Sequence, residues 1–202
     1  NMDSFIDWLH ALDQQITLLI NNIHCITSDS LMVFMSDRAV WFPLYAIVAG
    51  FLFVRLGWKK GLVAIVCIFL AFGACDQASN LLKYSVGRLR PCYSYEMVTG
   101  GLHFLENRGN FFGFFSAHAA NAFGFAMSTS LLFKYDKAHK YRPYTILIFS
   151  WAALLSLSRI FVGKHYLGDI LVGASIGCIF GYLAAIAGRY VFSLIDKNTI
   201  VR

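Results

Sequence analysis

The chain has 202 residues, of which 58% are hydrophobic, 16% aromatic and 14% charged, and its mean hydropathy is +0.60. This composition is too apolar for an ordinary soluble domain and predicts a single integral-membrane domain over residues 1–202. The formal net charge of +6 does not indicate a nucleic-acid partner, because the cations lie in short connections between apolar runs. Five cysteines fit neither an even disulfide framework nor a CxxC zinc pattern.

Residues 1–27 predict a helical segment that lies along the membrane interface. Apolar residues recur at helical spacing from Phe5 to Ile23, but polar residues interrupt them too often for an ordinary span. The alternative that this segment forms a sixth span stays open. His10 and His24 belong to no motif and are expected to be solvated surface residues.

The following apolar runs predict an all-α polytopic bundle of about five to six transmembrane helices. The expected spans run from about Trp41 to Leu56, from Gly61 towards Val86, from about Ala117, from Pro143 to Ser158, and from about Gly168 to Ile195. Gly173, Gly177 and Gly181 recur every fourth residue in the last span, which is typical of a close-packing seam between membrane helices.

The second span is unusually polar in its latter half. Asp76 must face protein or water at that depth, and we expect it to support a site through an interhelical contact. Asp76 and Lys83 are two helical turns apart on one face, as are Lys83 and Arg90 if the helix persists. Residues 91–115 form a long connection rich in Gly and aromatics, which predicts an extracytoplasmic cover over the polar site. His103 within it is expected to be incidental.

The polar clusters all fall on one side of the predicted membrane. The opposite side carries Arg55, Lys59, Lys60, Lys134, Lys137, Lys140, Arg142, Lys197 and Arg202. Cytoplasmic loops are enriched in Lys and Arg, so the polar clusters are expected to face outward.

One stretch, from Ser158 to Asp169, places several polar groups between two apolar runs. His165 and Asp169 are four residues apart, so a helix that starts near His165 lets the carboxylate orient the imidazole. That arrangement suits an activated nucleophile. Taken alone, the stretch also fits a cationic juxtamembrane loop followed by a helix-capping Asp.

Three short motifs follow one another along the chain. Lys83 with Arg90 and Pro91 gives K-x6-R-P, Ser116 with His118 gives S-A-H, and residues 158–169 give S-R-x5-H-x3-D. Together they resemble the signature of the type 2 phosphatidic acid phosphatase superfamily, which includes membrane lipid phosphatases, bacterial acid phosphatases and vanadium haloperoxidases. The resemblance implies an acid phosphatase-like helical core. Phe115 and Ala117 depart from the Pro and Gly of the family pattern, which puts the close approach of the amide at position 117 to phosphate in doubt.

The chemistry of these residues suits a phosphate group. Lys83, Arg90 and Arg159 can supply fixed countercharge, and arginines offer forked donors to phosphate oxygens. Ser116 and Ala117 stand where the third span begins, and unpaired N–H groups there attract anions. Helix capping explains Ser116 equally well. Ser158 can add a further hydroxyl donor.

The mechanism that the resemblance implies uses two histidines. His165 attacks phosphorus, Asp169 orients it, and His118 protonates the departing oxygen before it activates water. The resemblance implies no metal and no cofactor in this site, and the sequence agrees because it offers one carboxylate beside the motif histidines.

The resemblance implies a lipid phosphate or diphosphate as substrate and membrane lipids as surroundings. The short chain, LDQQ in the opening segment and HAAN after Ser116 resemble bacterial undecaprenyl diphosphate phosphatases. This resemblance predicts hydrolysis of undecaprenyl diphosphate to the monophosphate, in the bacterial cytoplasmic membrane with the site facing the periplasm. Phosphatidylglycerol phosphate, phosphatidic acid and the phosphates of lipid A are alternative substrates. An alternative of another class is a non-catalytic lipid-binding or carrier protein. The sequence makes no prediction of oligomeric state.

Overall fold

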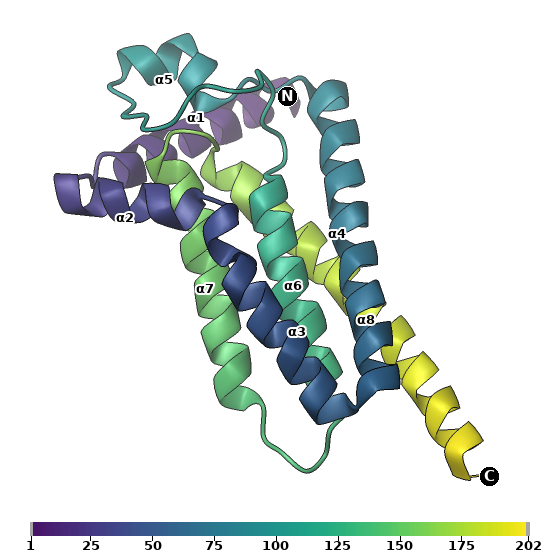
Figure 1. Cartoon of the computed structure of the whole chain (residues 1–202). Coiled ribbons are helices and arrows are strands. Elements are labelled where there is room, and N and C mark those ends of the chain that lie inside the picture. Colours follow the sequence, from purple (N-terminus) through teal and green to yellow (C-terminus); the bar gives the residue numbers. More distant parts are fainter. Residues whose placement is uncertain (1, 201–202) are drawn as a thin grey trace.

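The computed structural model describes residues 2–200, which form a bundle of five long helices with a smaller helical cap at one end (Figure 1). The bundle comprises α3 (Phe42–Leu56), α4 (Trp58–Val86), α6 (Ala117–Phe133), α7 (Arg142–Phe161) and α8 (Leu167–Ile200). The cap comprises α1 (Met2–Asn21), α2 (Ile26–Ser36) and α5 (Tyr95–Thr99), with short 3-10 turns η1 (Ala39–Trp41) and η2 (Pro91–Tyr93). The predicted all-α bundle is confirmed. Residues 1, 201 and 202, Arg202 among them, lie outside the described residues.

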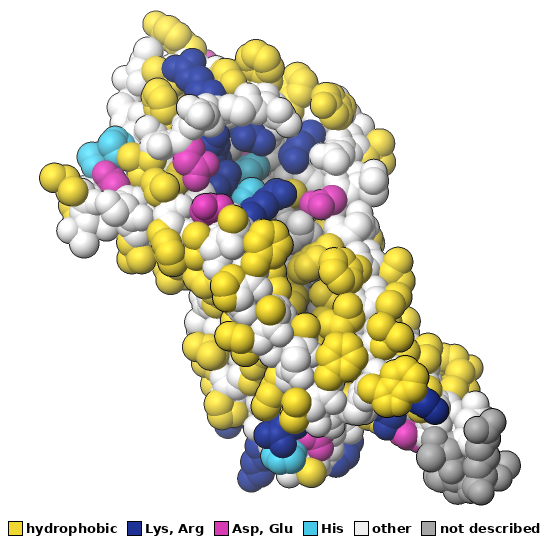
Figure 2. Space-filling view, in the orientation of Figure 1, with side chains coloured by type: hydrophobic (Ala, Val, Ile, Leu, Met, Phe, Trp, Pro, Cys, Tyr) yellow, Lys and Arg dark blue, Asp and Glu magenta, His cyan; other side chains and the backbone are white. Residues whose placement is uncertain are grey.

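The bundle has the length and surface of a multi-pass membrane protein. Among residues 2–200, four helical stretches are long and apolar enough to cross a membrane, namely 39–56, 58–86, 142–161 and 167–198. α6 has 17 residues, which is about the shortest length that spans a bilayer core. Hydrophobic side chains cover the middle of the face in Figure 2, whereas charged side chains gather towards both ends.

α6 is the central helix and contacts α3, α4, α7 and α8. Its closest approach is to α8, where a Cβ added at Gly177 would lie 2.1 Å from the carbonyl oxygen of Ala120. A Cβ at Gly181 would lie 2.4 Å from the carbonyl oxygen of Gly124. No side chain fits at these distances, so the predicted close-packing seam is confirmed.

The N-terminal segment forms a helix, α1, over the helical pattern predicted from Phe5 to Ile23, and a second helix, α2, follows it. α1 ends at Asn21, α2 begins at Ile26, and the two helices are bent by 116°. Cys25 and Ser28 form a capping box, in which each side chain accepts a hydrogen bond from the other residue's backbone N–H. This cap starts a new helix in a new direction. Together the two helices are also long and apolar enough to form one broken membrane span. The interfacial location of this segment therefore stays a prediction.

α4 ends before Arg90. Gly87 adopts a left-handed conformation with φ of 64°, and its N–H donates to the carbonyl of Lys83, which closes the helix. The condition under which Lys83 and Arg90 would share a helical face, that the helix persists to Arg90, is therefore not met. The backbone N–H of Arg90 instead donates to the carbonyl of Phe111 at 2.9 Å.

α1 is attached to the bundle by a polar stripe in which Asp13, Thr17 and Asn21 recur every fourth residue. Thr17 Oγ1 accepts a hydrogen bond from the N–H of Leu167 at 3.0 Å, and Asp13 Oδ1 accepts one from the N–H of Gly168 at 2.9 Å. These N–H groups belong to the first turn of α8, where no intrahelical acceptor exists. α1 therefore caps the start of α8 from outside.

The seam between α6 and α8 predicts a sharp difference between two glycines. In Gly177→Ala the new methyl group meets the backbone of Ala120, so we expect the free energy of unfolding to fall by roughly 1–3 kcal/mol. Gly73 in α4 has no heavy atom within 4 Å of an added Cβ, and alanine favours a helix by about 0.5–1 kcal/mol over glycine. Gly73→Ala should leave the thermal midpoint unchanged or raise it. Size-exclusion chromatography after heating in detergent measures both midpoints, and equal losses would contradict the packing argument.

Candidate active site

His165 and Asp169 lie at the start of α8 and contact each other. His165 Nδ1 is 3.4 Å from Asp169 Oδ2, and the same oxygen accepts a hydrogen bond from the N–H of Tyr166 at 3.1 Å. Because the contact engages Nδ1, Nε2 is the ring nitrogen that can act on a substrate. Burial lowers the pKa of His165 to about 4. The ring is therefore neutral at neutral pH, as a nucleophile requires.

Arg88 holds the other oxygen of Asp169. Its Nη1 is 2.8 Å from Asp169 Oδ1, its Nη2 is 2.7 Å from Asp13 Oδ2, and its guanidinium lies 3.9 Å from the ring centroid of Tyr166. Arg88 thus joins α1 to the start of α8 through two carboxylates. Sequence reasoning missed this residue because the motif singles out Arg90, and nothing in RLRP shows that its first arginine turns towards Asp169.

Cationic side chains converge near His165. A Cβ added at Gly109 would lie 3.4 Å from Arg90 Nη1 and 3.7 Å from Lys164 Nζ, so both cations face this backbone. Burial lowers the pKa of Lys164, because desolvation penalises its charged form. Arg90 also lies close enough to Arg159 for their charges to repel. Such a concentration of positive charge attracts a multiply charged anion.

Lys83 lies at the edge of this group. It lines a small pocket of about 160 Å³ between α4 and residues 110–112. It also lies close enough to Arg90 for their charges to repel. The structure therefore places Lys83 beside the other motif cations, although the two residues do not share a helix.

Glu106 supplies a countercharge from the segment between α5 and α6. Arg159 Nη1 lies 3.5 Å from each of its carboxylate oxygens, and Lys164 Nζ lies 4.0 Å from Oε2. The Ser36 hydroxyl donates to Oε1 and also contacts Arg159 Nη1. These contacts join α2 and the 91–115 segment to the motif arginine. Glu106 was not predicted, because no motif includes it, and a covering role for residues 91–115 remains a prediction.

Ser116 is the N-cap of α6 and also contacts the α8 end of the site. Its hydroxyl accepts from the N–H of Ala119 at 3.4 Å, and its own N–H donates to the carbonyl of Asp169 at 3.1 Å. Ala117 follows as the first residue of α6 and is buried. Ser116 therefore caps α6 and also lies beside the site, so the two explanations that the sequence left open for it are compatible.

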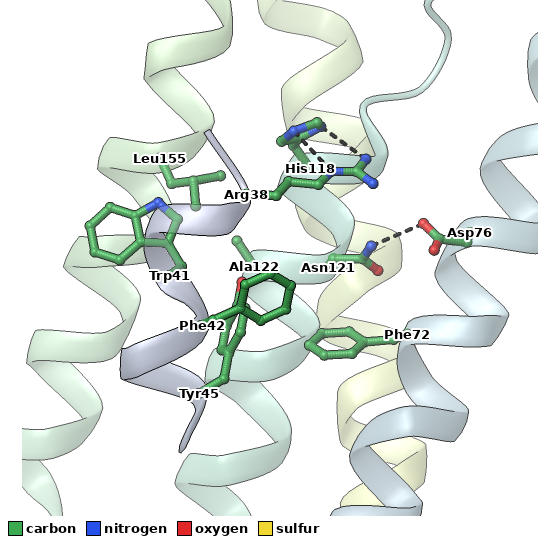
Figure 3. A pocket seen from close by; sticks show the side chains of 10 residues that line it. All are labelled: Arg38, Trp41, Phe42, Tyr45, Phe72, Asp76, His118, Asn121, Ala122 and Leu155. Atoms are coloured by element: carbon green, nitrogen blue, oxygen red, sulfur yellow. Dashed lines mark hydrogen bonds between the residues drawn. The ribbon is translucent and has the colours of Figure 1, made fainter. Parts of the chain in front are cut away.

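Arg38, just before η1, makes the hydrogen bonds to His118 that Figure 3 shows. Arg38 Nε donates to His118 Nε2 at 3.1 Å, and Arg38 Nη2 lies 3.3 Å from His118 Nδ1. Arg38 could not be predicted as a site residue, since it lies far from every motif in the chain. Arg38, His118 and Asp76 line one cavity of about 180 Å³. Asp76 accepts a hydrogen bond from Asn121 Nδ2 at 2.9 Å, which is the interhelical contact expected for it.

Ser158 differs from the prediction of a free hydroxyl donor. Its hydroxyl is buried and donates to the carbonyl of Leu155 at 2.6 Å within α7. Serine in a helix interior commonly bonds a carbonyl of the preceding turn in this way. The structure therefore commits the Ser158 proton to the helix and not to the site.

Comparison with known proteins shows the family of the chain. The model of the PAP2 superfamily matches residues 60–192. The chain is 36% identical over 198 residues to a lipid A 4'-phosphatase of Bacteroides thetaiotaomicron, covering 97% of this chain and 85% of that protein. It is 27% identical to a lipid A 4'-phosphatase of Porphyromonas gingivalis, covering 88% of this chain and 73% of that one.

A solved structure shares the fold. The crystal structure of a PAP2-type phosphatidylglycerolphosphate phosphatase from Bacillus subtilis aligns with a TM-score of 0.71 at 20% identity, covering 91% of this chain and 87% of that chain. With the family match over residues 60–192, these relationships show that the chain belongs to the PAP2 superfamily. It is a multi-pass membrane phosphatase.

The contact between Arg38 and His118 predicts a loss of activity in Arg38→Ala. Without this cation the His118 ring loses its hydrogen-bond partner, so kcat should fall about tenfold or more, equivalent to about 1.4 kcal/mol. KM should change less, and Arg38→Lys should restore part of the loss. Steady-state phosphate release measures these values.

Arg55→Ala is the matched control for this experiment. Arg55 Nη1 contacts His139 Nε2 at 2.8 Å in an exposed arginine–histidine pair that lies outside the site. Its kcat should stay near the wild-type value. Equal losses in the two arginine variants would contradict a specific role for Arg38.

Proposed function

We propose that this phosphatase hydrolyses a phosphate monoester of lipid A, with the 4'-phosphate as its preferred target. The site supports phosphoryl transfer through the His165–Asp169 contact beside Arg90 and Arg159. The 36% identity over 97% of the chain with a lipid A 4'-phosphatase supports the choice of lipid. This relationship favours the lipid A alternative over the undecaprenyl diphosphate that the sequence resemblance predicted.

In the proposed reaction, Nε2 of His165 attacks phosphorus and the bond from phosphorus to the sugar oxygen breaks. Asp169 stabilises the positive charge that develops on the ring through Nδ1. Arg90, Arg159 and Lys164 stabilise the added negative charge on the phosphoryl oxygens. His118, protonated at the start of the cycle, gives a proton to the departing sugar oxygen. It then takes a proton from water, whose oxygen attacks phosphorus while the bond from phosphorus to His165 Nε2 breaks and inorganic phosphate leaves.

The cavity beside His118 supports a lipid substrate. It shares Phe42, Tyr45 and Phe72 with an apolar groove of about 550 Å³ between α3 and α4. The groove is lined further by Ala46, Val48, Ala49, Ile65, Ile68, Phe69 and Phe125. An apolar groove that continues into a polar cavity suits a molecule with an acyl chain and a phosphorylated headgroup. The departing group of the substrate would lie on the His118 side.

The same proposal includes an orientation. The cap and the site lie at one end of the bundle (Figure 1). The basic residues of the α3–α4 and α6–α7 connections lie at the other end, which supports a cytoplasmic location for those connections. The site would then face the periplasm of a bacterial cytoplasmic membrane.

Two histidine variants test the chemistry. His165→Ala and His118→Ala should each reduce phosphate release from lipid A by several orders of magnitude, because bond formation and bond cleavage depend on them. Both proteins should elute from size-exclusion chromatography as the wild type does. Near wild-type turnover in a folded His165→Ala protein would remove the phosphohistidine step, and His139→Ala, whose ring contacts Arg55 in the exposed pair outside the site, serves as a control.

A substrate panel tests the choice of lipid. We expect kcat/KM for lipid A that carries only the 4'-phosphate to exceed the value for lipid A that carries only the 1-phosphate. It should also exceed the values for undecaprenyl diphosphate and phosphatidylglycerol phosphate by about tenfold, equivalent to about 1.4 kcal/mol in transition-state binding. Purified protein in one detergent gives comparable values. A tenfold preference for undecaprenyl diphosphate would restore the first prediction and leave the superfamily unchanged.

A further inference from the structure

A cluster of metal-binding side chains lies outside the phosphate site. His24 is in the connection between α1 and α2, Asp29 is in the first turn of α2, and His103 is in the segment between α5 and α6. One ligand atom from each lies within 4.8 Å of the other two. We propose that these residues, the His24–Asp29–His103 site, bind a divalent transition metal ion for which Zn²⁺ is the test ion.

The distances are close to those that a metal needs. Tetrahedral zinc with ligands at about 2.0–2.1 Å places neighbouring ligand atoms roughly 3.3 Å apart. His103 Nε2 and Asp29 Oδ2 are already 3.1 Å apart. A metal ion would replace the proton that these two atoms share. His24 is exposed, so its ring can move the remaining distance at little cost.

The donor set favours a transition metal over the alkaline-earth ions. Two imidazoles and one carboxylate suit Zn²⁺, whereas Mg²⁺ and Ca²⁺ prefer sites made of oxygen. The rings of His24 and His103 are stacked, with centroids 4.0 Å apart and an interplanar angle of 8°, so the exposed His24 ring must rotate out of the stack before its nitrogen can face the same ion as His103. Asp29 Oδ1 is a buried oxygen with no hydrogen-bond partner within the described part of the chain. A bound ion and its water ligands would satisfy that oxygen.

The backbone around the site is held firmly. Asn21 Nδ2 donates to the carbonyl of His103 at 2.8 Å and to that of Ile160 at 2.9 Å, while Asn21 Oδ1 accepts from the N–H of His103 at 2.8 Å. Asn21 is fully buried. The end of α1 therefore fixes the backbone of His103 against the end of α7, so this ligand stands on an ordered support before the metal arrives.

The metal would connect the α1–α2 turn to the segment that reaches the phosphate site. Glu106 follows His103 by three residues in this segment and contacts Arg159 and Lys164. None of the three metal ligands touches the phosphate-site cations in the contacts described above. The ion therefore acts on stability by tying the cap together, and the proposal does not depend on which lipid is hydrolysed.

The test measures Zn²⁺ binding to the full chain purified in detergent without a polyhistidine tag. After chelator treatment and its removal, wild-type protein should bind one equivalent of Zn²⁺ by isothermal titration calorimetry and elemental analysis, and its thermal midpoint should rise. Equal concentrations of Mg²⁺ or Ca²⁺ should give no rise. The kcat for phosphate release should differ by less than about twofold between the chelated and zinc-loaded protein, since the proposed phosphoryl transfer uses only side chains.

Variants identify the ligands. His24→Ala and Asp29→Asn should each abolish the zinc-dependent rise in thermal midpoint, and His24 is exposed, so the first variant should fold normally. Cys25→Ser is the matched control, because Cys25 adjoins His24 but is absent from the cluster. Its zinc binding should equal that of the wild type. No binding by the wild type, binding that survives His24→Ala, or binding lost in Cys25→Ser would overturn the proposal.

Discussion

The concentration of positive charge at one end of an apolar bundle is the constraint on which the site depends. Arg159 and Lys164 are each only 5% exposed, and isolated cations at such depth cost several kcal/mol. Glu106 offsets part of this cost, whereas Asp169 is paired with Arg88. The described contacts leave an excess of cations, which a phosphate dianion can neutralise. The unbalanced positive charge and the chemistry of the substrate therefore both favour a phosphate group as the ligand.

The countercharges reach the site from separate elements, so the site forms only when the cap and the bundle pack together. Asp169 comes from α8, Glu106 from the segment before α6, and Asp13 reaches Arg88 from α1. The glycine seam sets the distance between α6, which carries His118, and α8, which begins just after His165. A Cβ at Gly173 would lie 2.6 Å from the carbonyl oxygen of Ser116, so the start of α6 rests directly on α8.

The bundle and the motif residues could be predicted from the sequence because both depend on local patterns. Apolar runs give spans, and the four-residue spacing of His165 and Asp169 brings them together wherever a helix begins nearby. Arg38, Arg88 and Glu106 could not be predicted, because their contacts join segments far apart in the chain. α4 ends at Val86, where the expected span also ended, and the left-handed Gly87 that closes it is a typical end signal for a helix. The motifs also could not identify the substrate, because they specify chemistry on a phosphate group and not the lipid that carries it.

The polar stripe on α1 has a consequence for how the protein can be divided. The family match begins at residue 60, yet Asp13 and Thr17 accept the first free N–H groups of α8, beside His165 and Asp169. A fragment trimmed to the shared region would keep every motif residue and lose the acceptors that complete the helix carrying Asp169. The matched region alone therefore lacks two contacts that complete the start of α8, and transplanting it onto another membrane anchor requires that the first helix travel with it.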